Sequence, residues 1–132
     1  MARAWAEARG LPLVGISLGD PSGIGPEVTA AALALPRVRR ALRPVLFGDG
    51  PTLARFPTLA RYARTRALEA RPQGPLCVEL TRLAERERRS GRPSLAGGRA
   101  HVGVLGAAIE AARAVHSAST CPARAASMAA RT

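Results

Sequence analysis

The sequence predicts a single α/β domain built on a largely parallel sheet, and three observations lead to this fold class. The chain has 132 residues, which is the size of one domain. Apolar residues make up 47% of the chain, which argues against a disordered protein. Short apolar runs alternate with helical segments, a pattern typical of parallel strands joined by helical crossovers.

A strand, a glycine-rich loop and a helix are predicted over residues 13–35. Residues 13–18 form an apolar run rich in β-branched side chains, which predicts a buried strand, and turn residues follow it directly. Pro26 and Glu27 then open an alanine-rich segment. Proline suits the first helical turn, and a carboxylate there faces the positive end of the helix dipole. We expect this helix to begin within two residues of Pro26 and to stop at Pro36.

The alternation continues more weakly along the rest of the chain. Short apolar runs predict strands at 45–47 and 76–80, a helix is expected near Pro51, and residues 82–98 have the composition of an exposed connection. Residues 101–115 form the best later helix. Its larger apolar residues recur at helical spacing and predict the face that packs on the core, namely Val102, Leu105, Ile109 and Ala112.

The end of the chain has a different composition. Beyond Val115 there is no further valine, isoleucine, leucine or aromatic residue. We therefore assign residues 1–114 to the α/β domain and residues 115–132 to a divergent tail. Residues 117–132 are expected to be mobile and unpacked, because their apolar surface is too small to offset the cost of ordering the backbone.

The charge of the chain does not indicate a nucleic-acid partner. The net charge is +11 and every basic residue is an arginine, but these arginines are scattered and the densest patch is interleaved with Glu85 and Glu87. Aromatic residues are only 3%, too few for a surface that stacks bases. No apolar run approaches the roughly 20 residues of a membrane span. We expect no nucleic-acid or membrane partner and a cytoplasmic location.

The cysteines and histidines predict neither a disulfide framework nor a metal site. The chain has two of each, and no C-x-x-C pair occurs. No carboxylate is spaced to complete a local metal site with either histidine. These four residues are Cys77, Cys121, His101 and His116.

The stretch Gly19 to Glu27 is the motif most suggestive of chemistry. It follows a strand at the edge where open α/β sheets bind ligands, and the N–H groups of the following helix favour anions. Neither the P-loop motif nor G-x-G-x-x-G is present. Two interpretations of the stretch therefore remain, a tight turn without a ligand and a loop that binds one. We expect a positive φ at Gly25. The candidate ligand-contacting residues are Gly19, Asp20, Pro21, Gly23, Gly25 and Glu27.

Three stretches in order resemble one enzyme family. They are Ile16 to Val28, Leu46 to Ala54, and Gly91 to Ala100. Each is similar to a stretch of 4-hydroxythreonine-4-phosphate dehydrogenase, from pyridoxal phosphate biosynthesis. The first is also similar to the G-D-G-I-G-P-E stretch of isopropylmalate and isocitrate dehydrogenases. The resemblance implies a three-layer α/β/α fold of the isocitrate/isopropylmalate-dehydrogenase type, here incomplete.

The resemblance also implies an activity and its cofactors. The family oxidises 4-phosphohydroxy-L-threonine with NAD or NADP and a divalent metal (Zn, Mg or Co), and the product then loses carbon dioxide. Members are homodimers that act on a small phosphorylated substrate. The family's metal-binding histidines and substrate-binding residues lie beyond the part that this chain resembles, so no catalytic or metal residue is assigned here. We expect the chain alone to be inactive.

Two alternatives remain beside this interpretation. The chain could be a stand-alone, small α/β module that binds an anion or phosphate through the loop. It could also derive from a dehydrogenase of another phosphorylated hydroxy acid, because the residues that select the substrate are not in the part that resembles the family.

Overall fold

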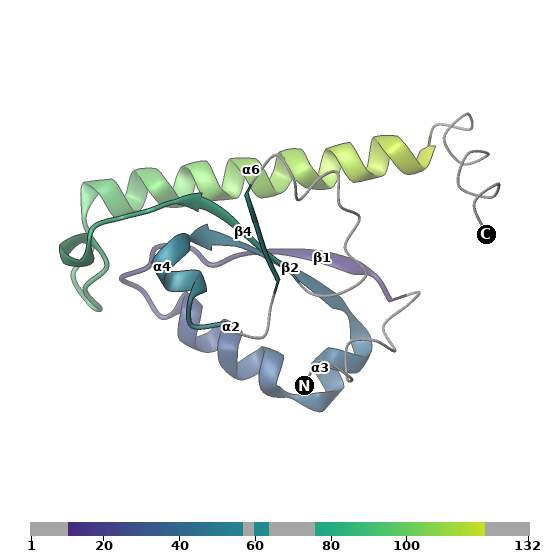
Figure 1. The fold of residues 1–132 in the computed structure, drawn as a ribbon, viewed down its shortest axis with the longest axis horizontal. Helices are drawn as coiled ribbons and strands as arrows, with labels where there is room; N and C mark the ends of the chain where they lie inside the picture. The colour runs from purple at the N-terminus through teal and green to yellow at the C-terminus, as the bar shows by residue number, and fades with distance from the viewer. Residues whose placement is uncertain (1–10, 57–59, 64–75, 121–132) are drawn as a thin grey trace.

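Three layers make up the fold in the computed structural model, which describes residues 11–56, 60–63 and 76–120. The central layer is a four-stranded sheet with the order β1-β2-β4-β3, and all three neighbouring pairs are parallel. Helices α2, α3 and α4 lie on one face and α6 lies across the other (Figure 1). The predicted α/β/α architecture is confirmed.

The described strands and helices have the following bounds along the chain. The strands are β1 (Leu13–Ser17), β2 (Arg43–Asp49), β3 (Ala60–Ala63) and β4 (Leu76–Thr81). The helices are α2 (Gly25–Ala34), α3 (Pro36–Ala41), α4 (Gly50–Leu53), the 3-10 turn η1 (Glu85–Glu87) and α6 (Leu95–Thr120). No helix in these described segments is long and apolar enough to cross a membrane.

Two apolar clusters fill the spaces between the layers. Alternate residues of β2 supply both, because successive side chains of a strand point to opposite faces. Beneath the sheet, against α2 and α4, the buried residues are Leu18, Leu33, Leu46, Leu53, Phe56 and Cys77. Above it, against α6, they are Val45, Phe47, Leu76, Val78 and Val104.

Strand β1 differs from the buried strand that the sequence predicts. Its first three residues are exposed, and burial begins only at the end of the strand, with Leu18 just beyond it 2% exposed. The reason is its place in the sheet. Within the described residues β1 pairs only with β2, so it is an edge strand, and its apolar run reads like that of a central strand.

The helix starts near prolines are largely as predicted. Helix α2 begins at Gly25, within one residue of Pro26, and ends before Pro36. Pro36 then opens a second helix, α3, which the sequence pattern does not predict. Proline suits the first turn of a helix as well as it ends one. Strand β3 was also not foreseen, and helix α4 has only four residues.

Helix α6 is longer than predicted, and its buried face is a different one. It begins at Leu95 rather than near His101, and it continues to Thr120, past the end expected at Val115. The predicted core stripe faces solvent, with Val102 73% exposed. The buried face consists of small residues, including Gly97, Val104 and Ala107, which let the helix lie close to the sheet. Of residues 117–132, which are expected to be mobile and unpacked, 117–120 belong to α6 and 121–132 lie outside the described residues.

Candidate ligand site at the carboxyl edge of the sheet

The loop after β1 folds back on itself through its own backbone. Gly19 has a φ of +75°, a conformation that favours glycine, and the Gly23 N–H donates to the Asp20 carbonyl oxygen at 3.0 Å. Before the turn, the Leu18 N–H donates to the Phe47 carbonyl at 3.0 Å, which ties the end of β1 to β2. The loop is therefore held at the carboxyl edge of the sheet.

Asp20 organises the interior of this loop. One of its carboxylate oxygens accepts hydrogen bonds from the backbone N–H and the hydroxyl of Ser22, both at 2.8 Å. The same carboxylate faces α6, where a Cβ placed on Gly97 would lie 3.0 Å from the Asp20 Oδ1. The Ser94 hydroxyl accepts a hydrogen bond from the Gly97 N–H and caps the first turn of α6. The glycine at position 97 lets this turn lie close to the Asp20 carboxylate.

Gly25 is required for a reason other than the predicted one. Among the described glycines, positive φ values occur at Gly19 and Gly91, so the expectation of a positive φ at Gly25 is wrong. A Cβ at Gly25 would instead collide with the carbonyl oxygen of Leu18. Helix α2 begins directly against the end of β1, and that close approach excludes any side chain at its first residue.

Glu27 lies at the exposed first turn of α2. Its own backbone N–H, and then the Arg55 guanidinium at 2.6 Å, hold the pKa of this carboxyl below its ordinary value of 4.5. Thus Glu27 uses one N–H group of the turn, and Asp20 uses the N–H of Ser22. A bound anion would compete with these two carboxylates, so the loop suits a hydroxyl group of a ligand better than a phosphate.

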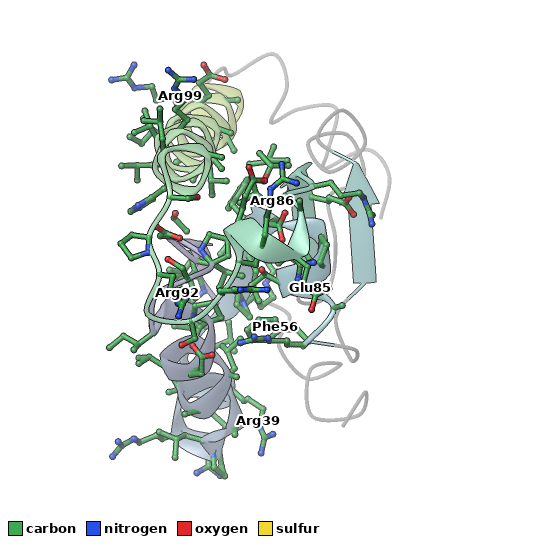
Figure 2. The ribbon with its side chains drawn as sticks, turned by 90° about the vertical axis from the view of Figure 1, so that its left-hand side faces the viewer. Arg39, Phe56, Glu85, Arg86, Arg92 and Arg99 are labelled. Carbon is green, nitrogen blue, oxygen red and sulfur yellow. The ribbon has the colours of Figure 1, made fainter. Side chains whose placement is uncertain are left out.

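Positive charge reaches this edge from the segment between β4 and α6. The Gly91 N–H donates to the Ser22 carbonyl at 2.9 Å, which fixes Arg92 next to the loop. Figure 2 views the carboxyl edge, with Arg86 on η1 and Arg92 beside the ends of the strands. Both arginines are exposed. The composition of residues 82–98 indicates only an exposed connection, because an exposed arginine beside a ligand site has the same local pattern as a solvated one.

Asp49 anchors the start of this segment. Its buried carboxylate accepts hydrogen bonds from the N–H and hydroxyl of Thr52 and from the Leu83 N–H, the last at 2.6 Å. The Arg88 Nε lies 3.8 Å from the same carboxylate. The second stretch that resembles the dehydrogenase family therefore has a structural role here. It joins β2, α4 and the chain that leaves β4.

His101 lies at this edge as well, although its sequence context indicates no role for it. A Cβ placed on Gly19 would lie 3.8 Å from both Cε1 and Nε2 of the imidazole. His101 follows Gly97 by one turn of α6, so the third family-like stretch carries it to the loop. We call the loop 19–27, Arg92 and His101 the edge site. Pro21 in the loop is buried, and Gly23 is exposed.

Metal ligands are not assembled in the part of the chain that the structure describes. No group of three or more histidine, cysteine, aspartate or glutamate side chains lies close enough to hold a metal ion there. Asp20 and His101 both belong to the edge site, but they are two groups and not three.

Comparison with known proteins identifies relatives of this chain. No family model matches it. A 4-hydroxythreonine-4-phosphate dehydrogenase from Geobacter metallireducens is 39% identical over 94 residues, which is 66% of this chain and 28% of the relative. An X-ray structure of a 4-hydroxythreonine-4-phosphate dehydrogenase from Burkholderia phymatum superposes with a TM-score of 0.62 at 32% identity, covering 78% of this chain and 33% of the other. The resemblance to the 4-hydroxythreonine-4-phosphate dehydrogenase family is confirmed.

This chain matches less than half of the length of these dehydrogenases. A D-threonate 4-phosphate dehydrogenase from Cupriavidus necator is also similar, at 51% identity over 39 residues, which is 30% of this chain and 12% of the relative. The likeness therefore extends to dehydrogenases named for two different phosphorylated substrates.

Proposed function

We propose that this chain forms one wall of the active site of an NAD(P)- and metal-dependent dehydrogenase of pyridoxal 5'-phosphate biosynthesis. The substrate of this reaction is 4-phosphohydroxy-L-threonine. The reaction would oxidise its secondary hydroxyl to a ketone, with NAD(P) taking up the hydride and the hydroxyl proton being released, and the resulting 3-keto acid would lose carbon dioxide. The names of the most similar relatives and the fold of the solved neighbour support this proposal.

The observation that carries the proposal is the construction of the edge site. Three family-like stretches far apart in the sequence supply the loop, the start of α6 and the anchor at Asp49, and the first two meet at Gly97. In this site Asp20 accepts a hydrogen bond from a ligand hydroxyl. The Arg92 guanidinium pairs with a phosphate oxygen, for which its planar fork of donors is suited. His101 contacts the ligand from the side of α6.

The metal is assigned to no residue of this chain. The described residues do not assemble three ligands for a divalent ion, and we propose that its ligands come from another part of the enzyme. We propose accordingly that the 132-residue chain does not catalyse the oxidation alone. On the family resemblance we also propose a cytoplasmic, homodimeric enzyme.

The D-threonate 4-phosphate dehydrogenase from Cupriavidus necator supports a second candidate substrate. D-threonate 4-phosphate has the phosphate and hydroxyl groups that Arg92 and Asp20 would contact. A third possibility, a stand-alone module that binds only phosphate, would need no hydroxyl on its ligand. Binding measurements with these ligands therefore distinguish the three functions.

Isothermal titration calorimetry of the full chain tests the proposal. The ligands are 4-phosphohydroxy-L-threonine, D-threonate 4-phosphate and inorganic phosphate. We expect one of the two hydroxy acids to bind more tightly than phosphate. Arg92→Ala should weaken that binding about tenfold, the loss expected for one charge-assisted contact. Arg37→Ala, which removes an exposed arginine from α3, is the matched control and should have no effect.

Three outcomes would reject parts of this proposal. Equal losses in the two arginine variants would remove Arg92 from the site. Phosphate binding as tight as that of either hydroxy acid would favour the stand-alone module. Metal-dependent formation of reduced nicotinamide by the chain alone, followed by absorbance, would show that it contains a complete catalytic site.

A further inference from the structure

Helix α6 carries an exposed apolar stripe on the side opposite the sheet. Among its members, Val102 is 73% exposed and Leu105 and Ile109 are close to half exposed. The residues recur at alternating spacings of three and four. We call this set the outer stripe, and it consists of Leu95, Gly98, Val102, Leu105, Ile109 and Ala112.

The spacing of the outer stripe is that of a helix seam. Alternating steps of three and four give a mean repeat of about 3.5 residues, the period with which one helix packs along another. From Leu95 to Ala112 the stripe runs for about 26 Å at 1.5 Å per residue. A Cβ placed on Gly98 or Gly106 would meet no atom within 4 Å, so a partner backbone can approach here. The stripe therefore fits one helix of about five turns.

Arginines flank the stripe on one side. Arg99 follows Gly98 and Arg113 follows Ala112, so the two occupy equivalent places two heptads apart, and both are exposed. Figure 2, which views α6 nearly along its axis, shows Arg99 on the side of the helix away from the sheet. Charges in this position select the partner helix, because they lie against its flanking residues. Glu110 is also exposed on this side of the helix, so the flank carries two arginines and one carboxylate. A partner with glutamate or aspartate on its flank would pair with both arginines.

A second copy of this chain is a poor occupant of the stripe. If two α6 helices pack antiparallel with Leu105 of one near Ile109 of the other, Arg99 of one copy approaches Arg113 of its partner, at both ends of the seam. Like charges in such positions repel. In a parallel pair the residues that would flank Arg99 and Arg113 are Ser94 and Ala108, neither of which is acidic. The net charge of +11 adds to the repulsion in either arrangement.

We propose that the outer stripe of α6 is a docking surface for an acidic amphipathic helix of another protein or domain. The apolar residues of the partner pack along the stripe, and its acidic flank pairs with Arg99 and Arg113. This surface lies on the far side of α6 from the sheet, so the proposal does not depend on the edge site or its ligand.

Synthetic helical peptides test the docking surface against the full chain. Two peptides of about 20 residues carry the same leucine seam, one with glutamate and one with lysine at the flanking positions. Fluorescence anisotropy is expected to show binding of the glutamate peptide at least about tenfold tighter than that of the lysine peptide. The double substitution Arg99→Glu with Arg113→Glu should reverse this preference. The control, Arg37→Glu with Arg40→Glu on α3, changes the charge equally and should not reverse it.

The apolar part of the surface has its own matched pair of variants. Leu105→Ser should abolish binding of the glutamate peptide, whereas Val28→Ser, at an exposed apolar position of α2, should leave binding unchanged. Circular dichroism confirms that each variant is folded. Absence of binding, equal binding of the two peptides, or equal effects of the two serine variants would overturn the proposal. So would a dimer in sedimentation that Leu105→Ser dissociates, because that result assigns the stripe to a second copy.

Discussion

Gly25 is the residue whose replacement should be the least tolerated in the loop. Gly25→Ala places a Cβ against the Leu18 carbonyl oxygen, which is backbone and cannot move aside without shifting β1 or α2. We expect it to lower the free energy of unfolding by about 1–3 kcal/mol, as overpacking does. Chemical denaturation measures this change.

Gly15→Ala is the control for this substitution. A Cβ at Gly15 would lie 3.4 Å from the Phe47 Cε2, an ordinary contact, in an exposed part of β1. Its effect should stay within about 1 kcal/mol, because alanine also restricts the unfolded chain. Equal destabilisation by the two alanines would contradict the close approach of α2 to β1.

Glu27 should make the stability of the chain depend on pH in the acid range. Because its pKa in the folded state lies below 4.5, its contribution is complete well above that pH. The contribution is lost as the pH falls from about 4.5 through the lower folded-state pKa. Glu27→Gln should therefore be less stable than the parent chain at neutral pH, and this difference should shrink at pH 3, as followed by urea denaturation.

The two causes of the lowered pKa of Glu27 can be separated with Arg55→Gln. Its backbone N–H is the larger cause, and Arg55 is the second. Arg55→Gln should accordingly reduce the pH dependence assigned to Glu27 without removing it. Complete loss of the pH dependence in Arg55→Gln would show that the ion pair, rather than the backbone, dominates.

At the scale of elements, two valines of α6 test which face of this helix packs against the sheet. Val104→Ala should cost about 2 kcal/mol, because the side chain is buried between α6 and the sheet. Val102→Ala removes the same atoms from the outer stripe and should change stability by less than about 0.5 kcal/mol. If thermal or chemical denaturation showed Val102→Ala to be more destabilising than Val104→Ala, the face that carries Val102 would be the core face, as the sequence predicts.

Helix α6 also shows where apolar periodicity is ambiguous. Valine, leucine and isoleucine predict the stripe 102–112 as the core face, yet the helix buries Val104 and a row of alanines. The side chains of the buried face are small because the helix lies close to the sheet and to Asp20. A pattern of hydrophobicity along the sequence does not report how closely a helix lies to its neighbours. Strand β1 misleads in the same way, since an apolar edge strand resembles a central one.

The strand, loop and helix over residues 13–34 were predictable for a different reason. Glycine and proline restrict the backbone locally, so Gly19 and Pro26 determine the turn and the helix start without reference to the rest of the fold. The edge site needed more than local rules. Arg92 and His101 reach the loop through contacts made over about 70 residues of chain, by the hydrogen bond to Ser22 and the approach at Gly97.

At the scale of the whole molecule, the fold joins three separated stretches into one site at the carboxyl edge of the sheet. The outer stripe lies on the far side of α6, and only its first residues, Leu95 and Gly98, belong to the turn of α6 that meets the loop. Ligand binding and partner docking would therefore perturb largely different residues, and each can be lost while the other is kept.

The most direct measurement of the edge site is a titration of the isotope-labelled full chain followed by amide resonances in NMR. The titrants are NAD and 4-phosphohydroxy-L-threonine. We expect the shifted amides to cluster at residues 19–27, at Gly91 and Arg92, and at Gly97 and His101. Shifts that cluster elsewhere, on α3 or on the outer stripe, or no shift at saturating ligand, would contradict it.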